Sequence, residues 1–137
     1  MIRKAPVSMI MTSPVITLKR NDSLEKAERL FKIHRIRHLP VVSGKVVVGI
    51  LSYHDLLRLS FADLTDSVDR DADALIYKMF TIKQVMRKNI VTVSPSNSIK
   101  EVAEIFAKRE FHALPVVIGS QLVGIVTTTD LIKHMLS

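Results

Sequence analysis

The sequence of 137 residues contains no cysteine, only seven aromatic residues and no long apolar run. Without cysteine there is no disulfide framework, and both thiolate metal sites and thiol catalysis are excluded. No apolar stretch approaches the roughly 18 residues that span a bilayer, and the first six residues lack the apolar region of a signal peptide. We therefore expect a cytoplasmic protein that has no membrane segment.

The residues that are present suit a globular domain with an anionic partner. Apolar residues make up 47% of the chain and charged residues 24%, so a core can form and long disorder is not expected. The net charge of +7 favours anions. However, no basic helix or Lys/Arg run occurs, and the few aromatic residues argue against stacking on single-stranded nucleic acid. A phosphate on a small ligand needs only two or three cations, which the chain offers.

The sequence contains an internal repeat. A shift of 75 residues aligns Met11–Arg58 with Met86–Lys133 without a gap, and 14 of the 48 aligned positions are identical. An internal repeat that holds register over this length outranks any local signal when a fold is predicted. The identical positions in the first copy are Met11, Thr17, Ser23, Phe31, Leu39, Pro40, Val41, Val42, Gly44, Val48, Gly49, Ile50, Asp55 and Leu56.

Each copy predicts a β-α-β-β-α unit, in which the two later strands form a hairpin. Ser98 and Glu101 have the spacing of a capping box at the start of a helix. One copy of about 50 residues is marginal alone, so we expect one α/β domain whose copies pack sheet to sheet with pseudo-twofold symmetry. The elements are expected at 15–18, 24–31, 39–42, 46–51 and from Tyr53, and at 90–93, 99–106, 114–118, 121–126 and from Thr128.

The predicted organisation is repeat 1 over 7–59, an acidic connecting segment over 60–81, and repeat 2 over 82–135. Between Leu59 and Thr81 there are five aspartates against one arginine and one lysine, a net charge of −3 that leaves +10 elsewhere. Apolar residues between Ala74 and Met79 predict part of a helix. We interpret the segment as a mostly solvated connection.

Two motifs in each copy carry a family likeness. The first copy has RHLPVV at 37–42 and GILSYHDL at 49–56, and the second has HALPVV at 112–117 and GIVTTTDL at 124–131. These four motifs, in this order, resemble a stand-alone pair of CBS domains, a family named after cystathionine beta-synthase. The resemblance implies a non-catalytic regulatory module that binds an adenine nucleotide in clefts between the copies. It also implies a homodimer and an unidentified regulated partner protein.

The resemblance further implies the ligand class. No cofactor is required, and the expected ligand is AMP, then ATP or ADP, with S-adenosylmethionine and NAD as further candidates. Ile16 and Val91, which are core residues on the simplest interpretation, would flank the adenine. An apolar pocket with a few polar groups fits a purine.

A hydroxyl residue followed three positions later by an aspartate is typical of a helix cap. A carboxylate can also accept two hydrogen bonds from a ribose diol, and a helix N-terminus attracts phosphate. The resemblance assigns Asp55 and Asp130 to ribose hydroxyls, and it assigns Ser52, Thr127 and Thr129 to ribose or phosphate. His54 stands where the second copy has Thr129, so the first copy departs from the hydroxyl pattern.

Basic residues precede the Leu-Pro-Val-Val strands and could be no more than a solvated strand entry. The likeness to the AMP-activated kinase gamma subunit assigns Arg37, His38 and His112 to phosphate. Arginine suits phosphate by its planar fork, and histidine by a charge that varies near neutral pH. Pseudo-twofold packing would bring Arg37 and His38 towards a ligand on Asp130. We expect the Asp130 cleft to bind best, because it keeps both hydroxyl residues and the aspartate.

Other functions are less well supported by the residues. His34 and His38 have helical spacing, but the second copy has Arg109 and Ala113 there, so no metal site is expected. Hydrolysis needs a nucleophile and base or paired carboxylates, and each cleft offers one acid, so no catalytic residue is expected. Two alternatives stay open: a basic protein that binds nucleic acid, and an oligomerisation scaffold whose cleft is empty.

Overall fold

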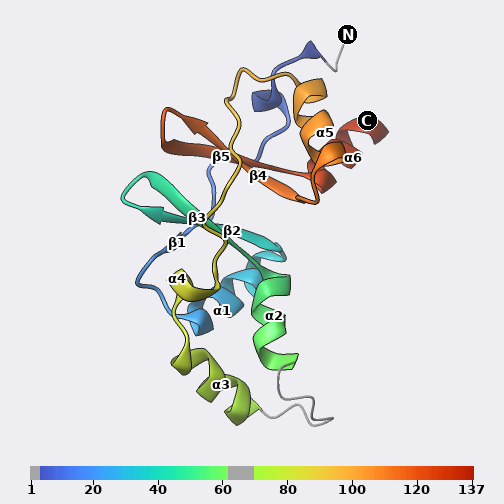
Figure 1. Ribbon diagram of the computed structural model, residues 1–137. Coiled ribbons are helices and arrows are strands. Elements are labelled where there is room, and N and C mark those ends of the chain that lie inside the picture. Colours follow the sequence, from blue (N-terminus) through green and yellow to red (C-terminus); the bar gives the residue numbers. More distant parts are fainter. Residues whose placement is uncertain (1–3, 62–69) are drawn as a thin grey trace. The chain divides into compact units, whose positions relative to one another are not determined.

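The computed structural model describes residues 4–61 and 70–137, which divide into two compact units (Figure 1). The first-repeat unit consists of residues 16–44 and 48–89. The second-repeat unit consists of the residues up to 15, residues 45–47 and residues 90–137. The units therefore do not follow the order of the chain, because the N-terminal segment belongs with the second repeat.

The first-repeat unit contains three strands and four helices in the described part of the chain. β1 runs parallel to β2, with Leu18 opposite Val41. β2 and β3 are neighbours joined by a tight turn in which Gly44 has φ +63°, a conformation that glycine adopts without strain. The elements are β1 (Leu18–Lys19), α1 (Leu24–His34), β2 (His38–Ser43), β3 (Val46–Ser52), α2 (Tyr53–Phe61), α3 (Arg70–Met79) and α4 (Ile82–Val85).

The second-repeat unit has the corresponding hairpin and helices. β4 and β5 are antiparallel, and Gly119 makes the turn between them with φ +63°. The first residues of β3, which belong to this unit, pair with β5 at Val46 and Gln121. The elements are a short 3-10 helix η2 (Val7–Met9), α5 (Ile99–Lys108), β4 (Ala113–Ile118), β5 (Gln121–Thr127) and α6 (Thr128–Leu136).

Each unit has its own apolar core, and the same positions of the repeat supply it. In the first-repeat unit α1 buries Leu24, Ala27 and Phe31 against the hairpin. The spacing of three and four residues matches one helix face, as the sequence predicts. The other members of this core are Leu18, Leu39, Val41, Leu51, Leu56, Tyr77, Ile82 and Met86, and the second core is Val7, Val93, Val102, Leu114, Val116 and Val126.

The predicted hairpins and their flanking helices are confirmed, and so is the capping box at Ser98 and Glu101. The Ser98 hydroxyl accepts a hydrogen bond from the Glu101 N–H, and the Glu101 carboxylate accepts one from the Ser98 N–H. Hydrogen bonds from the Ser98 backbone and side chain hold the pKa of Glu101 below its usual value.

The predicted first strand of each repeat is wrong in extent. β1 has two residues instead of four, and in the second repeat only Val93 makes a bridge, to Val116. Pairing with the neighbouring strand begins only at Leu18 and Val93, so the residues before them stay outside the strand, and a turn directly afterwards ends the pairing. Lys19 donates its N–H to the Asp22 carboxylate at 2.8 Å, and Ser94 donates its N–H to the Asn97 side chain at 2.7 Å. The turn side chains thus take the backbone donors where the ladder would continue.

In the described part of the segment between the repeats, Leu75, Met79 and Phe80 are exposed and Tyr77 is buried. The helix expected near 74–79 is confirmed as α3, and Tyr77 on it is 5% exposed and part of the first core. The Tyr77 hydroxyl donates a hydrogen bond of 2.6 Å to Glu28 on α1. The aspartates at 63, 66 and 69 lie outside the described residues. No helix within 4–61 and 70–137 is long and apolar enough to cross a membrane.

Two equivalent glycines let the segments before each repeat approach a hairpin closely. A Cβ on Gly49 would lie 2.5 Å from Met86 Sδ, and one on Gly124 would lie 2.5 Å from Met11 Sδ. Backbone bridges stand beside both contacts. Thr12 exchanges two hydrogen bonds with Ile125, and Ile50 and Arg87, their equivalents, do the same. The segment before repeat 1 thus completes the second-repeat unit, and the segment before repeat 2 completes the first-repeat unit.

This packing predicts that Gly49→Ala destabilises the protein more than Gly124→Ala. The new methyl group at 49 would also lie 2.9 Å from the backbone carbonyl of Arg87, whereas at 124 its three nearest atoms all belong to the Met11 side chain, which can move. Overpacking of this kind costs about 1–3 kcal/mol, and we expect Gly49→Ala at the upper end. Chemical denaturation of both variants measures the difference. Equal losses of stability in the two variants would contradict this account of the two glycine contacts.

Candidate functional site

In the first-repeat unit, three of the five predicted site residues lie around the start of α2. Ser52 ends β3, and its hydroxyl accepts a hydrogen bond of 3.0 Å from the Asp55 N–H. The Arg37 carbonyl accepts the N–H of Tyr53 at 2.8 Å, which ties the residue before β2 to the first turn of α2. The Tyr53 ring packs against Phe31 with centroids 5.3 Å apart. The local fold thus brings Arg37, Ser52 and Asp55 to one place.

The second-repeat unit repeats this arrangement at the start of α6. Thr127 and Asp130 form a complete capping box: the Asp130 N–H donates to the Thr127 hydroxyl at 3.2 Å, and the Thr127 N–H donates to Asp130 Oδ2 at 2.9 Å. The carbonyl of His112 accepts the N–H of Thr128 at 3.0 Å. The imidazole of His112 and the side chain of Thr129 are exposed, and Asp130 is partly buried. These four residues therefore surround one helix N-terminus.

The remaining predicted residues lie at the edge of the cores. Ile16 is half-buried and packs against the first core, and Val91 is half-buried and packs against the second. His38 is the first residue of β2 and is partly buried. Partial exposure of Ile16 and Val91 leaves apolar surface that could contact a flat ring. Five of the ten predicted residues belong to each unit.

The two aspartates differ sharply in their surroundings, which sequence reasoning did not predict. Asp55 is 8% exposed and has Arg87 Nε 3.4 Å from Oδ2 and Arg58 Nη1 3.8 Å from Oδ1. Asp55 Oδ2 is buried and makes no hydrogen bond among the residues described. The negative charge of a buried carboxylate needs a compensating positive charge, and Arg87 and Arg58 supply it.

Arg87 is the functional candidate that sequence reasoning missed. It stands 32 positions after Asp55 in the chain, so no local spacing links the two residues. The only signal available was the repeat itself: the position equivalent to Arg87 is Thr12, an exchange of a cation for a short neutral side chain. The backbone bridge to Ile50 places Arg87 close enough to Asp55 to form an ion pair, and this contact could not be seen in the sequence.

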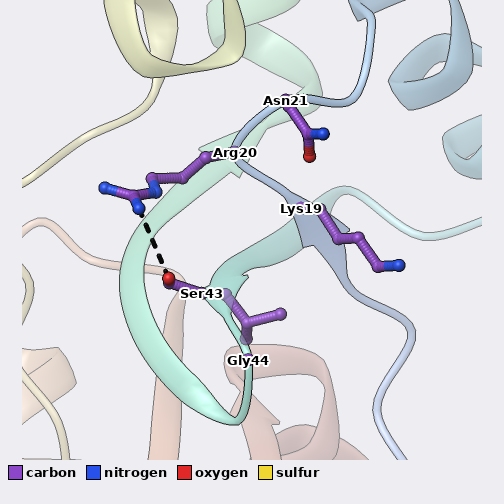
Figure 2. Close-up of a pocket in the computed structure, with 6 residues that line it drawn as sticks. Lys19, Arg20, Asn21, Ser43 and Gly44 are labelled. Atoms are coloured by element: carbon purple, nitrogen blue, oxygen red, sulfur yellow. Dashed lines mark hydrogen bonds between the residues drawn. The ribbon is translucent and has the colours of Figure 1, made fainter.

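A separate surface pocket of the first-repeat unit lies at the other end of β2 (Figure 2). It is lined by Lys19, Arg20, Asn21, Val42, Ser43 and Gly44, and Arg20 donates a hydrogen bond of 3.4 Å to the Ser43 hydroxyl. None of the ten predicted site residues lines it. All but Val42 are exposed, so the pocket is a shallow basic surface.

The turn that follows this pocket carries one perturbed carboxyl. Burial alone would raise the pKa of Asp22, but the N–H of Lys19 and the ammonium of Lys26, 3.2 Å away, hold that pKa below its usual value. Within 4–61 and 70–137 no three His, Asp or Glu side chains gather in a way that could hold a metal ion.

Comparisons of the sequence find relatives that are mostly longer proteins. The uncharacterized protein MJ1225 of Methanocaldococcus jannaschii is 30% identical over 93% of this chain, and this chain spans 42% of it. An inosine-5'-monophosphate dehydrogenase of Korarchaeum cryptofilum is 33% identical over 85% of this chain, which spans 21% of that protein. The chain thus spans less than half the length of these curated relatives.

Solved structures of similar length share the fold. CBSX2, crystallised with AMP, is 25% identical with a TM-score of 0.79, and the match covers 96% of both chains. The CBS domain pair of protein MJ0100, crystallised with 5'-methylthioadenosine and S-adenosyl-L-methionine, is 28% identical with a TM-score of 0.76 and covers 96% of this chain and 95% of that one. The CBS-domain family model matches twice, over residues 7–62 and 82–137, and the chain belongs to that family as a tandem pair of CBS domains.

Proposed function

We propose that this chain is a non-catalytic regulatory module that binds an adenine nucleotide, with AMP ahead of ATP and ADP. The observation that carries the proposal is the arrangement around α6. There a carboxylate, two threonine hydroxyls and a histidine lie at a helix N-terminus, and the same unit holds the half-buried Val91. A ribose diol, a phosphate and a purine need groups of these three kinds.

The chemistry divides among the residues by their position. Within the described part of the chain, Asp130 Oδ2 accepts only the Thr127 N–H, so the carboxylate keeps lone pairs for ribose hydroxyls. Thr129 and His112 are exposed near the positive end of the α6 dipole, where phosphate is favoured. The resemblance to CBS domains adds Arg37 and His38 as further proposed phosphate contacts. Ile16 and Val91 would contact the adenine.

Relatives support the ligand class. CBSX2 was crystallised with AMP, and the CBS domain pair of MJ0100 was crystallised with two adenosine-containing molecules. Both match this chain over 96% of its length. The adenosine moiety is common to all three ligands, and it is the part that Asp130 and Val91 would hold. We infer an adenosine-containing ligand on this basis, and the regulated partner protein stays unidentified.

The proposal that the chain is not an enzyme follows from the same side chains. Each helix start offers one aspartate, and in both repeats that aspartate is engaged by a cap or by an arginine. Hydrolysis by paired carboxylates needs a second acid beside the first. The relatives that are named as enzymes are much longer than this chain.

The first test of function compares AMP with adenosine by calorimetry. Phosphate contacts are charge-assisted and contribute roughly 1.5–3 kcal/mol each, so adenosine should bind at least tenfold more weakly than AMP. Asp130→Ala should weaken both ligands, because both carry the ribose. The double variant Arg37→Ala and His112→Ala should weaken AMP and leave adenosine unchanged.

Controls in this experiment separate the parts of the proposal. Lys133→Ala, on the same helix and exposed, should bind AMP as the parent does. A melting-temperature screen with ATP, S-adenosylmethionine, NAD and short DNA ranks the ligands, since binding raises the midpoint by mass action. A shift with DNA alone would replace the proposal by nucleic-acid binding. ATP recovered from the screen should be intact, and turnover lost in Asp130→Ala would refute the absence of catalysis.

We also propose that the chain forms a homodimer in which α6 takes part. Ile132, Met135 and Leu136 on α6 are 55%, 80% and 81% exposed. Their spacing of three and four residues puts them on one face of the helix. Three large apolar side chains gathered on one exposed face favour an interface over solvent contact.

Light scattering at micromolar concentration should therefore give twice the 15.4 kDa mass of the chain. The variant Ile132→Glu with Met135→Glu should give the single-chain mass, because two carboxylates would have to be buried without partners. Lys133→Glu is the matched control, since it adds the same charge outside the apolar face. A single-chain mass for the parent protein would end the dimer proposal.

A further inference from the structure

Asp55 and Asp130, which are equivalent in the two repeats, differ in the charged groups that contact them. Arg87 is brought to Asp55 by the two hydrogen bonds that its backbone exchanges with Ile50, at 3.0 and 2.9 Å. Its Nε then lies 3.4 Å from Oδ2 of a carboxylate that is 8% exposed. The guanidinium itself stays half exposed, at 51%. Asp55 is thus paired with a cation that is itself half exposed to solvent.

The equivalent place beside Asp130 has no such cation. Thr12 exchanges the same backbone hydrogen bonds with Ile125, at 2.8 and 3.1 Å, but its side chain is short, neutral and exposed. Throughout the described part of the chain no basic side chain forms an ion pair with Asp130. Among the described residues Asp130 is engaged only by the cap with Thr127, which leaves one of its carboxylate oxygens without a partner there.

We infer that Arg87 closes the Asp55 half-site, so that the chain binds one adenine nucleotide, at Asp130. Thr12, which is the equivalent of Arg87 in the other repeat, leaves the Asp130 half-site open. The inference rests on the proposed function and decides which half-site performs it. A ribose diol on Asp55 would have to displace Arg87 from the carboxylate. Breaking a partly buried ion pair leaves a charge to be resolvated, which opposes binding.

The experiment is AMP titration by calorimetry on the full chain. The parent should bind one AMP per chain, and Asp130→Ala but not Asp55→Ala should remove that binding. Arg87→Thr, which copies the residue of the other repeat, should raise the stoichiometry to two. Thr12→Arg should weaken AMP at the Asp130 half-site by roughly tenfold or more, the effect of about 1.4 kcal/mol.

Matched variants separate the ion pair from size and folding. Arg87→Gln keeps the length of the side chain without its charge and should also open the site. Thr12→Gln adds length without charge and should bind as the parent does. Arg58→Ala removes the other cation near Asp55, whose side chain is 62% exposed, and should leave the stoichiometry at one.

Loss of Arg87 leaves a buried carboxylate with Arg58 alone, so folding is checked by circular dichroism and melting. If Arg87→Thr is unstable, adding Asp55→Asn should restore stability and return the stoichiometry to one, because the ribose acceptor is lost. A folded Arg87→Thr or Arg87→Gln that still binds one AMP overturns the inference. So does a parent that binds two AMP, or one that loses its binding in Asp55→Ala. If neither the parent nor any variant binds AMP, the proposed function falls with it.

Discussion

The close approach of Met11 to Gly124 and of Met86 to Gly49 is the contact on which both units depend. In each case a segment that precedes one repeat in the chain is paired by two backbone hydrogen bonds with the hairpin of the other repeat. A side chain larger than hydrogen at either glycine would occupy the space of the methionine sulfur. Because the missing piece of each unit comes from elsewhere in the chain, neither repeat as written in the sequence is a complete folding unit.

This exchange also explains how the candidate half-sites are built. The hairpin delivers a hydroxyl residue to the start of α2 or α6, and the carbonyl of Arg37 or His112 fixes the strand entry beside it. Cap formation and the proposed ligand binding therefore use the same few residues. The cap holds the first turn and the positive end of the helix dipole in a fixed place, which favours an anionic ligand.

Much of this could be predicted from the sequence, because it depends on local pattern. The hairpins follow from β-branched runs around Gly44 and Gly119, and the helices follow from apolar spacing and capping residues. The extent of the first strands could not be predicted, because it is set by pairing with Val41 and Val116, which are distant in the chain. The burial of Tyr77 could not be predicted either, since it depends on Glu28, 49 residues away.

The candidate site was predictable in its residue types and not in its asymmetry. Asp55 and Asp130 are identical in the aligned repeats, and each follows a hydroxyl residue by three positions. What distinguishes them is supplied by the exchanged segment, which carries arginine in one unit and threonine in the other. The chemistry available to a repeated carboxylate is thus set by a residue that the local motif does not contain. A tandem repeat built by such exchange can keep two equal frameworks and still hold two unequal half-sites, because one substitution in each crossing segment decides the charge that each carboxylate meets.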